Sequence, residues 1–363
     1  MVAGERTGNT PEPSGTGAAG TAAGAHPAAE LIARLARRAD AMVEDLVPAT
    51  APFALLDFPH MPNVGDSAIW MGTLACLRRI GRPAPRYTCS NRTFDADLLR
   101  RHLPHGTILL SGGGNFGDLY EPHQRLREEV IRAFPDHTIV QLPQTLHFAS
   151  REALDRARQV FRSHRSFTLL ARDEPSLALA RDPLGVASRL CPDMSFCLGP
   201  LARIGEPEHD TVWLSRRDRE AAVDGDPLAP PSVHRVDWPR DPQLPFEAGY
   251  RLLSREVRRR RPLRAPLQPI LSRAYEPVAR ARVRRGCRIL SSGRRVITDR
   301  LHGHILCLLL GIPHFVLDNS YGKVRAFHEC WTRESELGRW CDSPAEALAL
   351  ATGDAQPLPS SRG

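Results

Sequence analysis

Short apolar runs alternate with longer amphipathic stretches over much of this chain. Apolar residues recur at helical spacing in residues 29–47, and that stretch ends before Pro48. Strands are then predicted at 53–58, 86–90, 107–111, 138–143, 167–171 and 188–191, and helices between them at 66–80, 95–103, 122–134, 151–164 and 174–180. Such alternation is typical of a parallel sheet with helices on both faces.

A stretch rich in Gly, Pro and charged residues at 199–210 separates this half from a second one. There the pattern predicts strands at 211–215, 232–236, 295–298 and 314–317, and helices at 276–293, 300–311, 323–331 and 343–351. We therefore expect an α/β fold in which two Rossmann-like domains face a central cleft. The expected division is a disordered tail at 1–28, domains at 29–200 and 208–352, and a flexible end at 353–363.

Composition places the chain among soluble globular proteins. It has 363 residues, of which 42% are apolar and 25% charged, and no apolar run reaches the roughly 18 residues of a membrane helix. Residues 1–28 lack the apolar centre of a signal peptide, so we expect a cytoplasmic protein. The eight cysteines form no C-x-x-C pair, which predicts buried reduced thiols and no metal site.

The positive charge is concentrated in one segment. Residues 251–300 hold 16 arginines and three acidic residues, a net charge of +13, which leaves −5 for the rest of a chain whose total is +8. Clustered arginine favours phosphate-bearing partners. Because only Tyr275 lies among the arginines between 255 and 295, we expect no specific nucleic acid. Peripheral contact of residues 251–290 with an anionic membrane, at its inner face, remains an expectation.

A glycine-rich loop follows the third predicted strand, in the sequence LLSGGGNFGDLY. Its glycines fit G-x-G-x-x-G, but residues 118–122 intervene before the helix and the next strand ends without an acidic residue. Both features speak against a dinucleotide site. The loop is then either a structural turn or part of a substrate cleft, and the second reading makes Gly113, Gly114 and Asn115 candidate binding residues.

Polar side chains also follow other strands of the first half. Asn63 and Asp66 lie after the first strand, Gln144 after the fourth, and Asp173 after the fifth. Asn63, Asp66 and Asp173 could each simply cap a helix. Together they form a pattern, because the carboxyl ends of parallel strands are where open α/β sheets bind ligands. The pattern favours a site for a hydroxyl-bearing molecule.

The second half places cations at equivalent points. Arg216 follows one strand, Arg300 and His302 begin an apolar helix after another, and Ser320 and Lys323, the only lysine of the chain, follow a third. Free N–H groups of a helix start and a guanidinium together suit a small anion, and an adjacent histidine can transfer a proton. The alternative is an Arg–Asp ion pair with core histidines, and His304 fits that description equally well.

In this order, the motifs NVGDSAI, LLSGGGNFGDLY, LPQT, ARDEPS, CPDMSF, LSRRDRE and DRLHGHILCLLLGIP…LDNSYGKV make the chain resemble the polysaccharide pyruvyl transferase family. The resemblance implies two Rossmann-like halves similar to GT-B glycosyltransferases. It also implies transfer of the pyruvyl group of phosphoenolpyruvate, the co-substrate, onto two sugar hydroxyls, with a cyclic ketal and phosphate as products. No metal or nucleotide cofactor is implied.

The resemblance also implies roles for individual residues. Arg300, Leu301 and His302 match the family's R-L-H that holds phosphoenolpyruvate, and Arg216 matches its other donor arginine. From the chemistry of the transfer we expect His302 and Arg300 to be catalytic, His302 as the main acid or base. Arg216, Ser320 and Lys323 complete the predicted donor site. The predicted acceptor site, for a sugar, a glycan or a lipid-linked saccharide, comprises Asn63, Asp66, Gly113, Gly114, Asn115, Gln144 and Asp173. A GT-B nucleotide-sugar glycosyltransferase and a basic protein that binds anions or membrane surfaces are the alternatives.

Overall fold

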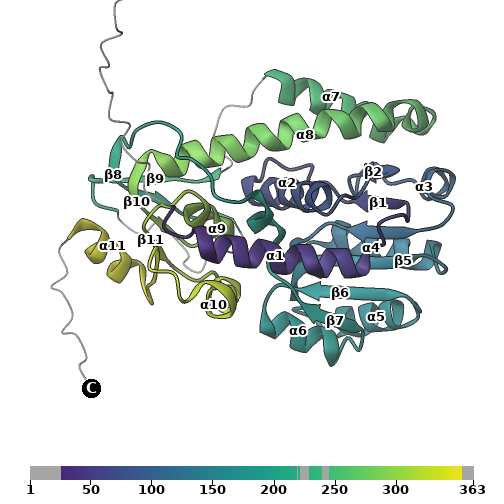
Figure 1. The fold of residues 1–363 in the computed structure, drawn as a ribbon, viewed down its shortest axis with the longest axis horizontal. Coiled ribbons are helices and arrows are strands. Elements are labelled where there is room, and N and C mark those ends of the chain that lie inside the picture. Colours follow the sequence, from purple (N-terminus) through teal and green to yellow (C-terminus); the bar gives the residue numbers. More distant parts are fainter. Residues whose placement is uncertain (1–25, 219, 221–228, 239–244, 354–363) are drawn as a thin grey trace, which may run out of the picture.

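Two parallel β-sheets organise the protein in the computed structural model, which describes residues 26–218, 220, 229–238 and 245–353 (Figure 1). The first sheet has the strand order β2-β1-β3-β5-β6-β7, with β4 also pairing with β5. Its strands are β1 (Phe53–Leu56), β2 (Tyr87–Cys89), β3 (Thr107–Leu110), β4 (Gly113–Gly117), β5 (Thr138–His147), β6 (Phe167–Ala171) and β7 (Ala187–Leu190). The associated helices are α2 (Val64–Arg79), α3 (Ala96–His102), α4 (Glu121–Ala133), α5 (Arg151–Arg162) and α6 (Glu174–Arg181).

The second sheet has the order β12-β11-β10-β8-β9, and all its pairs are parallel. The strands are β8 (His209–Leu214), β9 (Val233–Val236), β10 (Gly293–Thr298), β11 (His314–Val316) and β12 (Gly338–Trp340). Helices α9 (Leu301–Leu309), α10 (Lys323–Phe327) and α11 (Pro344–Thr352) accompany it, with a π-helix at His328–Thr332 and a 3-10 helix at Met194–Leu198 before it.

Helices α7 (Pro245–Arg259) and α8 (Arg261–Ser291) form a hairpin that runs over α2 and β2 (Figure 1). The Gln268 amide nitrogen donates to the Thr88 carbonyl oxygen at 2.5 Å, and the Ser272 hydroxyl donates to the same oxygen at 3.1 Å. Gly286 allows α8 to approach α2, because a Cβ there would lie 2.3 Å from Val64 Cγ1. The Arg-rich segment 251–290 is therefore part of a helical hairpin that packs on α2 and β2, and its second helix leads into the second sheet.

One apolar core joins the two halves. Leu31 of α1 (Ala29–Leu46) and Val64 of α2 belong to the same buried cluster as Val212 of β8 and the apolar face of α9. Ile32, Leu35 and Val43 of α1 are buried at the spacing of one helix face, which explains why this segment forms a helix against the body. The first sheet has a further core between its strands and helices α3–α6.

The predicted α/β class with parallel sheets is confirmed. The division into two domains about a cleft stays a prediction, since α1, α2 and α8 pack across both halves. Of the predicted tail, residues 1–25 lie outside the described residues, and 26–28 contact the body through His26, whose Nε2 lies 2.9 Å from the Leu309 carbonyl oxygen. Of the predicted flexible end, 354–363 also lies outside them. Among described helices, none has both the length and the apolarity to cross a membrane.

Candidate functional site

Each sheet has one point at which its strand order reverses. In the first sheet β1 lies between β2 and β3, and in the second sheet β8 lies between β9 and β10. Loops that leave the carboxyl ends of strands on either side of such a point diverge, which opens a crevice. The segments after β1, β3, β8 and β10 all contribute to one cavity of about 280 Å³.

This cavity, which we call the inter-sheet cavity, is lined by both halves. The first half contributes Met61, Pro62, Asn63, Asp66, Gly114, Asn115, Tyr120, His123 and Arg172, and the second half contributes Arg216, Asp218, Glu220, Trp238, Arg300, Leu301, His302 and Lys323. All but four of the predicted donor-site and acceptor-site residues therefore line this one cavity. A larger cavity of about 430 Å³, between α2, β2 and α8, lies away from these strand ends.

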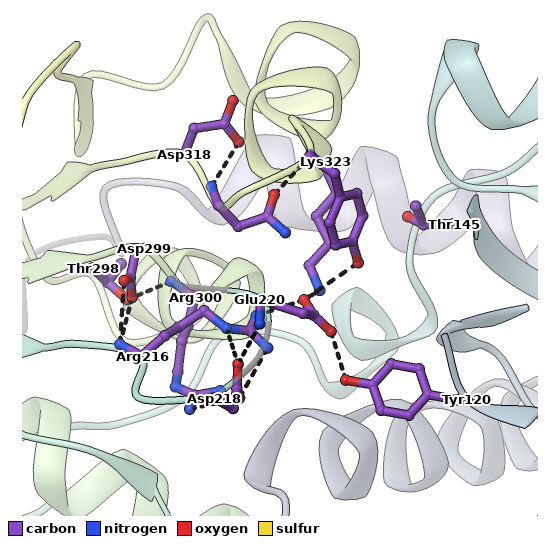
Figure 2. Close-up of polar contacts among 12 residues, drawn as sticks. Tyr120, Thr145, Arg216, Asp218, Glu220, Thr298, Asp299, Arg300, Asp318 and Lys323 are labelled. Atoms are coloured by element: carbon purple, nitrogen blue, oxygen red, sulfur yellow. Dashed lines mark hydrogen bonds and ion pairs between the residues drawn. The ribbon is translucent and has the colours of Figure 1, made fainter. Parts of the chain in front are cut away.

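Asp218 bridges the two arginines of the predicted donor site (Figure 2). Arg216 donates from Nε and Nη2 to the two Asp218 carboxylate oxygens at 3.0 and 3.1 Å, and Arg300 Nη2 donates to Asp218 Oδ2 at 3.3 Å. Burial alone would raise the pKa of Asp218, but the two guanidinium groups lower it to about 2. Asp218 is therefore an anion held between two guanidinium groups.

Glu220 gathers the remaining polar groups on this side (Figure 2). Its carboxylate accepts hydrogen bonds from Lys323 Nζ and from the Tyr120 hydroxyl, the latter at 2.7 Å, and Arg216 Nη1 lies 2.9 Å away. Lys323 is buried, and this burial, reinforced by Arg216 and Arg172, lowers its pKa to about 8 in spite of Glu220. Near neutral pH the lysine is mostly charged, and small pH changes alter that charge.

Arg300 is fixed from behind by a buried carboxylate. Its Nε and Nη2 donate to the two oxygens of Asp237 at 2.7 and 2.9 Å. Both side chains are almost inaccessible to solvent. Such a bidentate pair fixes the plane of the guanidinium, so the edge that faces the cavity is set before a ligand arrives. Asp299 caps no helix: it accepts from the Arg216 backbone N–H at 2.9 Å, while Arg300 occupies the N-cap of α9.

His302 stands on α9 but is enclosed by the first half. A Cβ on Gly65 would lie 2.4 Å from His302 Nδ1, so only glycine leaves room for the ring. On the other side, His302 Nε2 lies 3.5 Å from Asp193 Oδ2, an ion-pair distance too long for a good hydrogen bond. Asp193 is itself bound by Arg172 at 2.7 Å, and although burial alone would raise its pKa, His302 and Arg172 hold it well below its usual range.

The comparisons with known proteins agree with this geometry. Residues 63–321 match the family described as polysaccharide pyruvyl transferase. The chain belongs to the polysaccharide pyruvyl transferase family. It is 34% identical over 311 residues to "Pyruvyl transferase 1" of Schizosaccharomyces pombe. The aligned region covers 82% of this chain and 74% of the relative. It is also 30% identical over 298 residues to "Putative pyruvyl transferase EpsO" of Bacillus subtilis, with coverages of 79% and 87%.

A solved structure of an uncharacterized protein from Klebsiella pneumoniae has the same fold. It superposes with a TM-score of 0.50 and 17% identity, and the match covers 85% of this chain and 99% of that one. Family membership makes this protein a transferase and implies a saccharide acceptor. It also favours the pyruvyl transferase reading over the nucleotide-sugar glycosyltransferase alternative.

Four predicted site residues of this pyruvyl transferase family member lie outside the cavity lining. Gln144 is buried behind the glycine-rich loop, where its amide binds Asn115 Oδ1 at 3.0 Å. Asp173 caps α6 and accepts from the Thr145 hydroxyl at 2.7 Å, so capping explains it. Gly113 belongs to β4, with a φ of 146°. Ser320 is exposed, and its backbone N–H donates to the Glu220 carbonyl oxygen at 3.2 Å.

Asn63 combines two roles. It caps α2 by accepting from the Gly65 N–H at 2.9 Å, and it also lines the cavity. The glycine-rich loop likewise approaches the site closely, since a Cβ on Gly114 would lie 2.8 Å from Arg172 Nη2 and 3.8 Å from Lys323 Nζ. The loop thus lies against two cations of the cavity lining, and its role in a substrate cleft stays a prediction.

His304 and the cysteines take no part in the cavity. His304 is fully buried and bonded to His314 and the Thr332 hydroxyl, as a core histidine. Every cysteine is a free thiol. Within the described ranges, one group that could hold a metal ion consists of Asp40, Cys76 and Cys197, but the Asp40 carboxylate is already occupied by Arg79 at 2.6 and 2.8 Å.

Sequence reasoning missed several residues that line or support the cavity. Tyr120 lies on the segment between the glycine-rich loop and α4, which reads only as an interruption of a motif, and His123 lies in the first turn of α4, where it reads as an ordinary helix residue. Asp218 and Glu220 lie within LSRRDRE, but their partners are distant in the sequence: Arg300 at the start of α9 binds Asp218, and Lys323 at the start of α10 binds Glu220. Asp57 was counted as part of an apolar strand.

Proposed function

We propose that this family member transfers the pyruvyl group of phosphoenolpyruvate onto two hydroxyls of a saccharide, with a cyclic ketal and phosphate as products. The observation that carries the proposal is the convergence of Arg216, Arg300 and Lys323 with His302 in one cavity lined by both halves. Phosphoenolpyruvate carries about three negative charges near neutral pH, and planar guanidinium groups suit its phosphate and carboxylate.

The two arginines of the predicted donor site are already paired with carboxylates, and this pairing affects how the donor would bind. Asp218 holds the position between Arg216 and Arg300 that an anionic donor would take, and its side chain is 43% exposed. We infer that the donor displaces this carboxylate toward solvent, whereas Asp237 remains paired with Arg300 and keeps it oriented. The donor would thus replace the Asp218 carboxylate between the two arginines. While the site is empty, that carboxylate reduces the repulsion between the two guanidinium groups.

The residues suggest the following division of work. Arg300 and Arg216 would stabilise charge that develops on the leaving phosphate, because fixed cations act where water is excluded. His302 would supply a proton to C3 of phosphoenolpyruvate, which leaves C2 open to attack by a hydroxyl. Asp193, whose Oδ2 lies 3.5 Å from Nε2 of this histidine, would help to hold the ring in place. The scheme involves no change of oxidation state and therefore needs no redox cofactor. Because Arg216, Arg300 and Lys323 supply the positive charge, we propose no metal ion either, only phosphoenolpyruvate as co-substrate.

The direct test is incubation of the purified protein with phosphoenolpyruvate and p-nitrophenyl glycosides of galactose, glucose, mannose and N-acetylglucosamine. We expect a product with the mass gain of one pyruvyl ketal and an equal amount of phosphate. Arg300→Lys keeps the charge but loses the bidentate geometry, so the KM for phosphoenolpyruvate should rise by roughly tenfold. Arg325→Lys, at an exposed arginine outside the cavity, is the control. No ketal with any glycoside in this panel, together with no binding of phosphoenolpyruvate, would refute the proposal.

We also propose that the α7–α8 hairpin contacts an anionic membrane surface. Phe246, Leu252 and Ile270 are exposed large apolar residues of this hairpin, and Arg258–Arg261 are exposed at its turn. Apolar side chains among arginines suit the interface of an acidic bilayer. This would bring a lipid-linked saccharide acceptor near the enzyme.

Flotation with vesicles of phosphatidylcholine, with and without phosphatidylserine, tests the membrane contact. We expect binding only with the acidic lipid, and loss of binding when Arg258–Arg261 are all changed to glutamine. The matched control changes four exposed arginines on or near α5, which lies away from the hairpin (Figure 1): Arg151, Arg156, Arg158 and Arg165. Equal flotation of both variants, or binding that persists at high salt, would contradict this surface.

A further inference from the structure

A second histidine–carboxylate pair lies on the first-half wall of the inter-sheet cavity. Asp57 directly follows β1, at the point where the strand order of the first sheet reverses. Its backbone φ angle is 69°, and among the described non-glycine residues Asp57 alone has a positive φ. Such a backbone conformation is uncommon outside glycine and recurs at functional sites, where the surrounding structure maintains it.

The strained residue holds a ring that lines the cavity. His123 Nδ1 lies 2.7 Å from Asp57 Oδ2, while the Asp57 side chain is only 3% exposed and that of His123 is 17% exposed. The contact assigns the Nδ1 proton to the side of the carboxylate, which leaves Nε2 as the nitrogen available for proton transfer. Carboxylate–imidazole contacts of this kind fix a histidine's tautomer and ring orientation.

The surroundings keep Asp57 ionised. Burial alone would raise its pKa, but His123, with Arg127 and His60, brings the pKa below its usual value. Its second oxygen, Oδ1, is buried and has no hydrogen-bond partner among the described residues. His60 stacks on His123 with ring centres 5.9 Å apart, and burial lowers the pKa of His60 to about 4. Other charged groups near this pair are Arg92 and Arg282, beside His60, and Asp66, across the cavity lining.

The proposed reaction needs a base on this side. Each of the two acceptor hydroxyls loses a proton during ketal formation. In the overall balance, one proton is accounted for by the new C–H bond at C3, and the other ends on the released phosphate. His302 stands at the donor end, on α9 beside Arg300. A hydroxyl that attacks from the first half needs its own proton acceptor, and an imidazole with a free nitrogen near neutral pH is suited to this.

We propose that His123 is the general base for the attacking acceptor hydroxyl and that Asp57 is its positioning residue; this inference rests on the proposed function. The hydroxyl oxygen forms a bond to C2 while its O–H bond breaks, and the proton moves to Nε2 of His123. The C=C electron pair takes a proton at C3 from His302. In the following step the C2–O bond to phosphate breaks and its electron pair leaves with the phosphate. The oxygen of the second hydroxyl then forms its bond to C2 while its O–H bond breaks, and that proton passes to the released phosphate.

Three variants test this assignment on the full chain. His123→Gln retains a polar side chain but removes the base, and Asp57→Asn removes the charge while asparagine tolerates the left-handed backbone. His137→Gln is the matched control, because His137 is buried outside the cavity and bonds the Leu103 carbonyl oxygen at 3.0 Å. The assay uses whichever p-nitrophenyl glycoside the wild type converts fastest, with phosphoenolpyruvate affinity measured separately by calorimetry.

We expect His123→Gln to lower kcat by roughly 10²- to 10⁴-fold while the Kd for phosphoenolpyruvate changes less than twofold. Asp57→Asn should lower kcat less, because the imidazole keeps a hydrogen-bond partner but loses the fixed carboxylate, while the KM values of both substrates stay within twofold. A merely structural Asp57 would instead change the KM values and the melting temperature together with kcat. If the wild type forms ketal and His123→Gln keeps more than half of kcat, this inference is wrong and the proposed function stands. If the wild type forms none, both fall.

Discussion

The substitution Gly65→Ala tests whether the position of the His302 ring matters, because it moves the ring without changing the imidazole itself. Gly65 is the second residue of α2, with a helical backbone that alanine adopts without strain, so the substitution alone should not disturb the helix. The added Cβ, however, would lie 2.4 Å from Nδ1, 2.7 Å from Cγ and 2.9 Å from Cβ of His302. Carbon and nitrogen atoms normally approach no closer than about 3.5 Å, so the ring must move by about 1 Å.

The expected effect follows from that displacement. A reacting group misplaced by about 1 Å can cost on the order of 10²-fold in rate. We therefore expect kcat for ketal formation to fall about 100-fold in Gly65→Ala, while the melting temperature stays within a few degrees of the wild type. The KM for phosphoenolpyruvate should change little, since Arg216 and Arg300 keep their carboxylate partners.

Gly249→Ala provides the control. Gly249 lies in α7, and a Cβ there would meet nothing within 4 Å, so this change should leave activity unaltered and stabilise the helix by up to about 1 kcal/mol. Steady-state kinetics by phosphate release, with thermal unfolding of each variant, separates the two effects. A Gly65→Ala protein with full activity would show that His302 does not need its place against α2, and the assignment of His302 as proton donor would fail.

Three other changes address the rest of the site and its support. Asp218→Asn should lower the Kd for phosphoenolpyruvate several-fold by calorimetry, because the amide competes less well for the arginines; weaker binding would mean that Asp218 orients them instead. The KM for phosphoenolpyruvate should rise above pH 8, where Lys323, with its pKa lowered to about 8, loses its charge, and Lys323→Arg should remove that rise; a wild-type KM that is flat from pH 7 to 9 would exclude a binding role for the ammonium group. Gly286→Ala should lower the melting temperature, because its Cβ would lie 2.3 Å from Val64 Cγ1 in the contact between α8 and α2; an unchanged value would show that this contact relaxes freely.

Local patterns were sufficient to predict most strands and the polar residues at their ends. The apolar runs at 53–58, 107–111 and 167–171 correspond to β1, β3 and β6, because short apolar stretches between helices become buried parallel strands. The position of Arg300 and His302 was also predicted, since a charged pair before an apolar helix is unusual. The strand β12 was missed because three residues that alternate in burial carry little signal.

What could not be predicted depends on tertiary contacts. Three prolines at 266, 269 and 277 argue against a helix by propensity, yet α8 continues through them because its apolar face packs on β2 and α2. Similarly, nothing near His302 in the sequence points to Gly65 or Asp193, which enclose it from the other half. Asp57 reads as a strand residue, and only its backbone conformation and its contact with His123 distinguish it.

The burial of Lys323 has a practical consequence. It is the only lysine in 363 residues, so apart from the terminal amine every amine-selective reagent has a single target in this protein, inside the inter-sheet cavity. Acylation by an activated ester, followed by intact mass, would then report directly on whether that cavity is filled, and saturating phosphoenolpyruvate should slow the labelling.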